Sequence, residues 1–361
     1  MTEIRTTDDG ARFQRPGIYD DALIQRASRF TYDTILHHDL AVKTLEYAHG
    51  KILEIQADVE KWYQDEFGYP FNRFKLGETF EETRRKFLDH KEFDSVLKLL
   101  GIDQSLKEKI RLPWWSEVSL VETNAVENNT EVNATFSPAH SFHIQLLRSK
   151  NLSQDEASSL PIFGHSVTVS GLLITTPSDD ALQGKIALGV RGGSSFSNTI
   201  HMVAGAAKYS DSMLRENPPS LTDIFITTEL KEESGFNAER SSVKTLARFV
   251  DAGLAPYPGD VNYCFLVETG LSKDELVRVW GENADADRDE HEKIVFINND
   301  PESVREFLKS MFFGISENKM DRTRGQMELL YPASLALCAQ VGISLHELGE
   351  IAENNQSRKT W

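Results

Sequence analysis

The sequence has little cysteine and no long apolar run, and each absence excludes a class of protein. Its two cysteines, Cys264 and Cys338, are too few for a disulfide framework in a chain of 361 residues. Both lie in apolar runs, so we expect two buried free thiols. Eighteen consecutive apolar residues occur nowhere, and residues 1–16 lack the apolar segment of a secretory signal. We therefore expect a soluble, cytoplasmic protein without a membrane partner.

Positive charge is also in short supply. Asp and Glu number 56 against 39 Lys and Arg, so the formal net charge is −17 at pH 7. No clustered basic stripe is visible, and a nucleic-acid polymer is therefore not an expected partner. A smaller phosphate-bearing ligand would need a metal ion or a local arginine.

The residue pattern divides the chain into four parts. Residues 1–16 are polar and charged, and we expect a disordered tail there. Apolar residues then recur mostly at helical spacing from about Ala22, which predicts a helical N-terminal domain of roughly four helices over 17–112. Residues 113–325 mix strand and helix patterns. Residues 326–361 have helical periodicity and predict two closing helices.

Aromatic residues are dense in the helical part. They are Trp62, Tyr63, Phe67, Tyr69, Phe71 and Phe74. Core packing is the simpler interpretation, because large rings dominate the energetics of a small core. The alternative is a surface through which the N-terminal helices form a homo-oligomer or dock a partner.

Short aliphatic and β-branched runs predict the strands of the third part. The predicted strands cover 166–175, 185–190, 243–250, 260–268 and 293–298, and helices are predicted over 221–234, 272–280 and 301–312. The polar stretch 124–135 is typical of a loop or an irregular hairpin tip. Strands on both sides of one helix indicate an α/β sandwich.

The helix over 221–234 has recognisable ends. Ser220 is a suitable N-cap, and Asp223 occupies the position from which an acid reaches back to the cap. Gly235 is placed to end the helix in a left-handed conformation. Ile226 and Leu230 give the helix an apolar side that can anchor it.

Three carboxylates share another face of this helix. Glu229, Glu232 and Glu233 are spaced i, i+3 and i+4, so they lie within about one turn of each other and repel. A divalent cation would reverse the sign of that interaction, because Mg²⁺ and Mn²⁺ prefer hard oxygen ligands and bridge carboxylates to phosphates. Without a cation, the same pattern is a solvated acidic helix face.

Residues 228–236 resemble the second half of the Nudix hydrolase signature. That signature is a Gly, five residues, Glu, seven residues, then Arg-Glu-apolar-x-Glu-Glu-x-Gly-apolar, and Thr228 stands where it has arginine. Gly205 and Asp211 are similar to the opening Gly and the first acid. Sixteen residues, 212–227, separate Asp211 from Thr228 in place of seven, which is an insertion of nine.

The resemblance covers about 142–313 and implies a Nudix-like α/β/α sandwich, preceded by the N-terminal helical section and followed by the C-terminal helices. It implies Mg²⁺ or Mn²⁺ as cofactor, with Glu229, Glu232 and Glu233 as metal ligands. One of the pair Glu232 and Glu233 would then activate water for attack at phosphorus.

Further site residues follow from the same resemblance. A later acid can take the role of the base, and Glu290 and Glu292 in the stretch 285–292 are the candidates. Arg191 precedes two glycines and would contact phosphate in a bidentate manner. Gly205 would lie at the substrate, which is expected to be a nucleotide-type small molecule.

Two functions remain open from the sequence. The first is a divalent-metal-dependent hydrolase of a nucleoside diphosphate linked to another moiety. The second is a catalytically weak or inactive Nudix-fold protein that binds a nucleotide or a protein partner and regulates it. Thr228 in place of arginine and Asp211 in place of glutamate favour the second, whereas the three helix glutamates favour the first.

Overall fold

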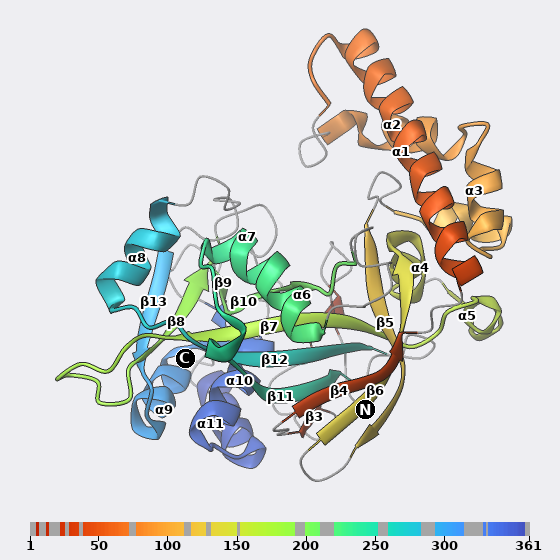
Figure 1. The fold of residues 1–361 in the computed structure, drawn as a ribbon. Coiled ribbons are helices and arrows are strands. Elements are labelled where there is room, and N and C mark those ends of the chain that lie inside the picture. Colours follow the sequence, from red (N-terminus) through yellow and green to blue (C-terminus); the bar gives the residue numbers. More distant parts are fainter. Residues whose placement is uncertain are drawn as a thin grey trace.

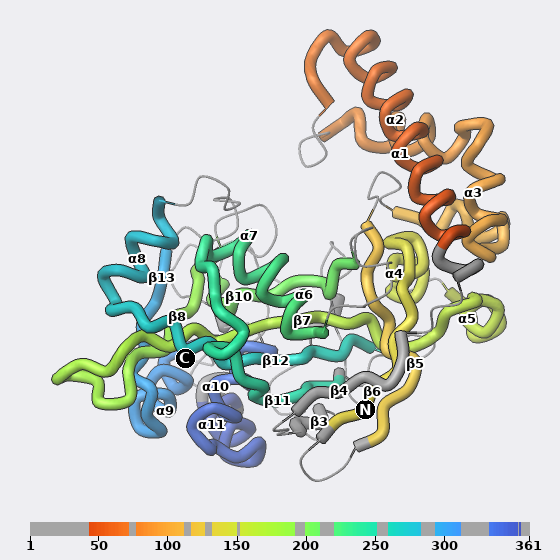
Figure 2. Tube along the Cα trace, in the orientation of Figure 1, coloured from red at the N-terminus to blue at the C-terminus, as the bar shows by residue number. Residues whose placement is uncertain are grey.

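The computed structural model describes most of the chain. The residues outside its description are 1–4, 7–11, 14–21, 26–28, 36–38, 72–76, 112–116, 128–130, 150–151, 192–198, 210–219, 252–258, 283–292, 314–327, 330 and 358–361. The described parts form a large mixed sheet with helices on both faces, and a helical section projects from one end (Figures 1 and 2).

The helical section agrees with its prediction from residue 39 to residue 109. Its elements are α1 (Asp39–Phe67), η2 (Gly77–Thr79), α2 (Phe80–Leu88), α3 (Phe93–Leu99) and η3 (Gln104–Lys109). Ala48, Ile52 and Ile55 form the buried stripe of α1 at helical spacing. This stripe packs into the same continuous core as the adjoining strands.

The helical prediction is wrong for 22–25 and 29–35. Here β3 (Ala22–Gln25) pairs with β11 (Val243–Asp251), and β4 (Arg29–Ile35) pairs in parallel with β6 (Glu131–His140). The sequence of β4, RFTYDTI, is rich in β-branched and aromatic residues, which favour strands when a partner strand is present.

The predicted N-terminal tail also holds regular structure. Within 1–16, β1 (Arg5–Thr6) pairs with β2 (Arg12–Phe13), and the remaining residues lie outside the description. The boundaries at 16, 112 and 325 stay predictions.

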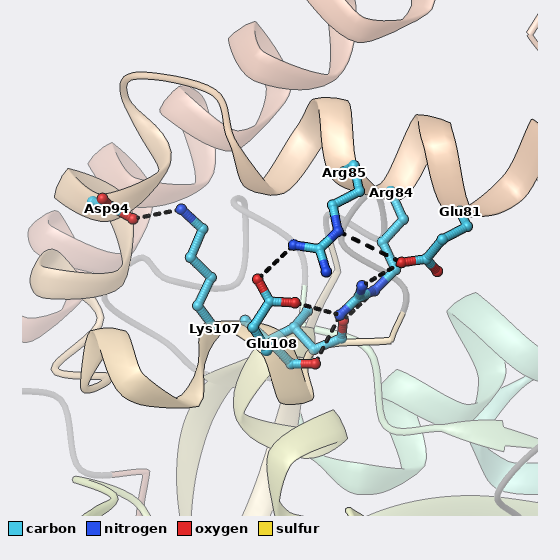
Figure 3. Close-up of polar contacts among 7 residues, drawn as sticks. Glu81, Arg84, Arg85, Asp94, Lys107 and Glu108 are labelled. Carbon is cyan, nitrogen blue, oxygen red and sulfur yellow. Dashed lines mark hydrogen bonds and ion pairs between the residues drawn. The ribbon is translucent and has the colours of Figure 1, made fainter.

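A buried arginine joins the helices of this section to one another. Arg84 of α2 donates from Nε to the carbonyl of Ile110 at 3.0 Å and from Nη2 to the carbonyl of Glu108 at 2.7 Å. Lys107 of η3 contacts Asp94 of α3 at 2.9 Å (Figure 3). These contacts attach α2 and α3 to the last segment of the helical section, residues 104–110.

The aromatic residues of the helical section pack mainly on one ring. Tyr63 is buried, and its ring meets those of Trp62, Phe67, Tyr69 and Phe71 at centroid distances of 4.8 to 6.5 Å. The core-packing interpretation is therefore confirmed for Tyr63 and for the partly buried Trp62, Phe67 and Phe71, whereas Tyr69 is 50% exposed. The sixth position, 74, lies outside the description.

Strand β7 is the hub of the large sheet. It runs over His165–Ile174 and pairs in parallel with β12 (Asp260–Glu268) along nine residue pairs. Its other neighbours are all antiparallel: β5 (Val118–Glu127), β8 (Lys185–Val190) and β10 (Val203–Ala206). The predicted strands at 166–175, 185–190 and 260–268 are thus confirmed and lie side by side.

The remaining strands extend the sheet beyond β8. They are β9 (Thr199–His201), β13 (Lys293–Asn298), β14 (Phe312–Phe313) and β15 (Glu328–Leu329). Of the two alternatives predicted for 124–135, the hairpin is confirmed and the loop is wrong, because β5 and β6 form an antiparallel hairpin whose strands include 124–127 and 131–135. The pairing of these two segments outweighs the polar composition of the stretch.

Helices cover both faces of the sheet, which confirms the expectation of a mixed α/β fold. In Figure 1 the green helix over 221–234 lies on one side of β7 and β12, and the blue helices lie on the other. Those on the second face are α9 (Pro301–Ser310), α10 (Tyr331–Val341) and α11 (Leu345–Ser357), and α10 and α11 are the two predicted closing helices. Further helices are α4 (Ser141–Leu147), α5 (Gln154–Ser159), η6 (Arg240–Ser242) and α8 (Lys273–Glu282).

Both cysteines are buried free thiols, as predicted. Burial raises the pKa of Cys264 to about 12, so its thiol stays protonated at neutral pH. None of the described helices combines the length and the apolar character that a bilayer crossing requires.

A buried ion pair ties three strands together. Glu122 of β5 accepts hydrogen bonds from Arg248 of β11 and from the hydroxyl of Tyr263 of β12, and all three side chains are at most 3% exposed. Burial raises the pKa of Tyr263 well above its ordinary value, and the charge of Glu122 adds to this effect. Tyr263 therefore remains a hydrogen-bond donor.

We predict that Arg248→Met destabilises the protein by about 3–5 kcal/mol, because the Glu122 carboxylate would be buried without its cation. The free energy of unfolding from urea titration measures this loss. Lys244→Met is the matched control, since Lys244 pairs with Glu268 on the surface and its removal should cost at most about 1 kcal/mol. Equal losses in the two variants would contradict the account.

Three histidines meet where α1 packs on β6 and α4. The rings of His49 and His140 lie 6.1 Å apart, and Nε2 of His143 donates to the carbonyl of Leu100 at 3.0 Å. Burial lowers the pKa of His143 to about 4. Burial, and then the neighbouring His143 and His49, lower the pKa of His140 well below its usual range. Both buried rings are neutral in the folded protein.

This junction should weaken in acid. A folded-state pKa below the unfolded value of about 6.5 means that unfolding takes up protons, so stability is present above pH 6.5 and falls as the pH drops toward 4. For His143 the expected loss between pH 6.5 and pH 5 is about 1–2 kcal/mol. Urea unfolding at the two pH values measures it, and His143→Gln should lose less between them than the unaltered protein does.

Candidate functional site

The helix over 221–234 begins and ends as its sequence predicts. Asp223 accepts from the backbone N–H and the hydroxyl of Ser220 at 3.0 and 2.7 Å, while the Ser220 hydroxyl accepts from the Asp223 N–H at 3.1 Å. Gly235 follows the last helical residue with φ 68°, a conformation that glycine adopts without steric cost. Arg240 contacts the capping carboxylate at 3.0 Å.

The middle of this helix is a π-helical turn, which the sequence prediction did not include. The order along the chain is α6 (Leu221–Phe225), η5 (Ile226–Leu230) and α7 (Lys231–Ser234). The hydroxyls of Thr227 and Thr228 donate to the carbonyls of Asp223 and Ile224, both at 2.7 Å. Side chains that bond their own helix in this way commonly bend it, and π-turns are frequent at functional sites.

An apolar side presses the helix onto the sheet. Ile224, Phe225 and Leu230 are fully buried, whereas Ile226, a predicted anchor, is only partly buried. The Phe225 ring stacks on Phe265 of β12 with centroids 5.1 Å apart. A methyl group at Gly171 of β7 would lie 2.4 Å from this ring, so the glycine allows the close approach.

The three glutamates have different surroundings. Glu229 and Glu233 are 4% and 5% exposed, whereas the side chain of Glu232 is 53% exposed. Glu233 Oε2 accepts from the backbone N–H of Ala204 at 2.9 Å, which fixes that carboxylate on β10. A solvated acidic face therefore describes Glu232 but not its two neighbours.

Gly205 lies directly against Glu229. A Cβ at Gly205 would stand 2.0 Å from Glu229 Oε2 and 2.4 Å from the carboxylate carbon. The sequence analysis proposed Gly205 as a substrate-binding residue. In the structure, Gly205 packs against the buried carboxylate of Glu229.

A lysine that sequence reasoning missed contacts two of the glutamates. Lys208 follows β10, and its Nζ lies 3.0 Å from Glu232 Oε2 and 3.8 Å from Glu229 Oε1. Burial acts to lower the pKa of Lys208, but the charge of Glu229, the hydrogen bond to Glu232 and the charge of Glu117 raise it above its ordinary value. The ammonium stays charged, and it bridges a buried and an exposed carboxylate. Its position three residues after Gly205 is the only signal that the sequence offered.

The other predicted site residues are less well placed by the structure. Arg191 is partly buried directly after β8, and its backbone N–H donates to the carbonyl of Thr199 at 2.8 Å. Glu290, Glu292 and Asp211 lie outside the described residues.

The chemistry of the donor set suits a hard divalent cation, but its present arrangement is not a ligand cluster. In the part of the chain that the structure describes, no three Asp, Glu, His or Cys side chains are grouped so that they could hold a metal ion. Three carboxylates on one helix face supply hard oxygen atoms, and the contact of Gly205 with Glu229 gives one of them a fitted position. Lys208 is the cation that holds two of them now.

Comparison with known proteins adds little to this picture. No family model matches the sequence, and no curated protein matches it. The chain is similar to a solved MutT/Nudix family protein from Enterococcus faecalis at a TM-score of 0.25 and 20% sequence identity. That match covers 38% of this chain and 46% of the other. A likeness at this level carries no argument, so any function must be argued from the site itself.

We predict that Gly205→Ala destabilises the protein by about 1–3 kcal/mol, because the new methyl group overlaps the Glu229 carboxylate. Gly205 lies in a strand, so alanine fits the backbone itself. In a Glu229→Ala background the same substitution should cost much less. A double-mutant cycle of unfolding free energies measures the coupling, and additive losses would show that the two residues are not in contact.

Proposed function

We propose that the chain is a divalent-metal-dependent hydrolase that cleaves the phosphoanhydride of a nucleoside diphosphate linked to another moiety, on a Nudix-like α/β/α sandwich. One observation carries the proposal. Glu229 and Glu233 are almost completely buried on a single helix, against the strand that contains Gly205.

The charge at this place favours a ligand of positive sign. The three helix glutamates and Lys208 together carry a formal charge of −2, from three carboxylates and one ammonium. Burying carboxylates costs free energy that hydrogen bonds and nearby cations must offset. A divalent cation carries more positive charge than a single ammonium, and Mg²⁺ or Mn²⁺ has the preference for carboxylate oxygen.

The residues of the chain divide the work in this proposal. Glu229, Glu232 and Glu233 would hold the metal ion, which supplies neutralisation of the diphosphate and a hydroxide at neutral pH. Glu233 starts from a fixed position, because the Ala204 N–H binds its carboxylate. Glu232 is exposed and free to meet solvent, so it suits proton transfer from water.

The proposed substrate contacts come from other elements. Arg191 follows β8 and has the guanidinium geometry that binds two phosphate oxygens at once. Glu290 and Glu292 remain alternative bases, because later acids are available in the stretch before β13.

A nucleotide panel tests the proposal. We expect release of phosphate-containing products from nucleoside diphosphates linked to a second group, only with Mg²⁺ or Mn²⁺ present. Glu232→Gln and Glu233→Gln should each lower kcat at least about a hundredfold, since loss of a metal ligand or a general base is a loss of that order.

The matched control is Glu302→Gln, a substitution of an exposed glutamate in the first turn of α9, which should retain full activity. Turnover that persists in EDTA, or that survives both substitutions in the helix, would contradict the proposal.

A second function is favoured by two specific contacts. Lys208 already neutralises part of the acidic face, and Thr228 directs its hydroxyl into its own helix instead of supplying a charge. Both features suit a Nudix-fold protein that binds a nucleotide or a protein partner and regulates it without turnover. Nucleotide binding that is retained without product release in any metal would select this alternative.

A further inference from the structure

Neither proposed function says what Lys208 does when a metal ion binds. We propose that its ammonium is the resting counter-ion of Glu229 and Glu232, and that a divalent metal ion must displace it to bind. The inference rests on the proposed metal site and adds to it a residue that sets the metal affinity.

The geometry places the ammonium on oxygen atoms that a metal ion would need. Nζ lies 3.0 Å from Glu232 Oε2 and 3.8 Å from Glu229 Oε1, so one cation spans the exposed and the buried carboxylate. An ammonium group has three donors and no acceptor, and it cannot join the ligands of a metal. Two cations on the same oxygen atoms would repel, so the two occupants exclude each other.

Lys208 comes from the sheet, not from the acidic helix. It forms an isolated bridge with Ser119 directly after β10, so its backbone is held while its long side chain reaches the helix. The side chain is 34% exposed, which leaves the ammonium a way into solvent. The flexible four-carbon stem of lysine allows that movement without a change of the backbone.

Competition of this kind has a thermodynamic consequence. A ligand that binds only one of two states has its apparent Kd raised by the population of the other state. The state with Lys208 on the carboxylates is the competing state here.

The test is a titration of the full-length protein with Mn²⁺ in the absence of substrate. The electron paramagnetic resonance signal of free Mn²⁺ measures how much metal is bound at each concentration and so gives the Kd. Lys208→Met removes the charge but keeps the length of the side chain, and we expect its Kd for Mn²⁺ to fall about tenfold. Lys208→Arg, which keeps the charge, should not bind Mn²⁺ more tightly. Lys208→Gln serves as a second neutral variant if the methionine variant does not fold.

Lys244→Met is the matched control, because Lys244 of β11 also pairs with a glutamate, Glu268 of β12. The Kd of this variant for Mn²⁺ should stay unchanged. An unchanged or higher Kd in both neutral variants of Lys208 overturns the inference and leaves the proposed metal site standing. If neither the unaltered protein nor these variants bind Mn²⁺ at millimolar concentration, the metal site itself is overturned. The two failures are therefore distinct.

Discussion

The burial of two carboxylates between a helix and a strand constrains the whole site. Glu233 accepts the backbone N–H of Ala204, and Glu229 fills the space that the missing side chain of Gly205 leaves. Negative charge in such a position is stable only when cations or hydrogen bonds oppose it. Lys208 and the backbone N–H of Ala204 supply this opposition in the present arrangement, and the proposed metal ion would take the place of Lys208.

The sheet makes that constraint rigid. β7 is paired along its length, and the Phe225 ring lies so close over Gly171 that the helix has little freedom to move away. The buried Glu122 and Arg248 join β5 to β11 on the same sheet. A site that depends on the positions of carboxylate oxygen atoms benefits from such a platform. The sheet thus positions the acidic helix face. Among the described interactions, none joins a residue of the N-terminal helices to Glu229, Glu232 or Glu233.

Local chemistry was predictable from the sequence, and long-range pairing was not. Ser220, Asp223 and Gly235 act within a few residues of the helix ends, and the strands at 166–175, 185–190 and 260–268 follow from their own aliphatic runs. The pairing of 22–25 with β11 and of 29–35 with β6 depends on strands more than ninety residues away, and the periodicity of the sequence does not show such pairing. Lys208 was missed for the same reason, because only the fold brings it to Glu229 and Glu232.

The central claim is that the acidic helix face holds a divalent cation, and a crystal structure of the full chain soaked in Mn²⁺ tests it most directly. The account predicts an anomalous-scattering peak at coordination distance, about 2.2 Å, from oxygen atoms of Glu232 and Glu233, with the Lys208 ammonium moved away from them. A structure with no such peak, and with Lys208 still bridging Glu229 and Glu232 at saturating Mn²⁺, would contradict it.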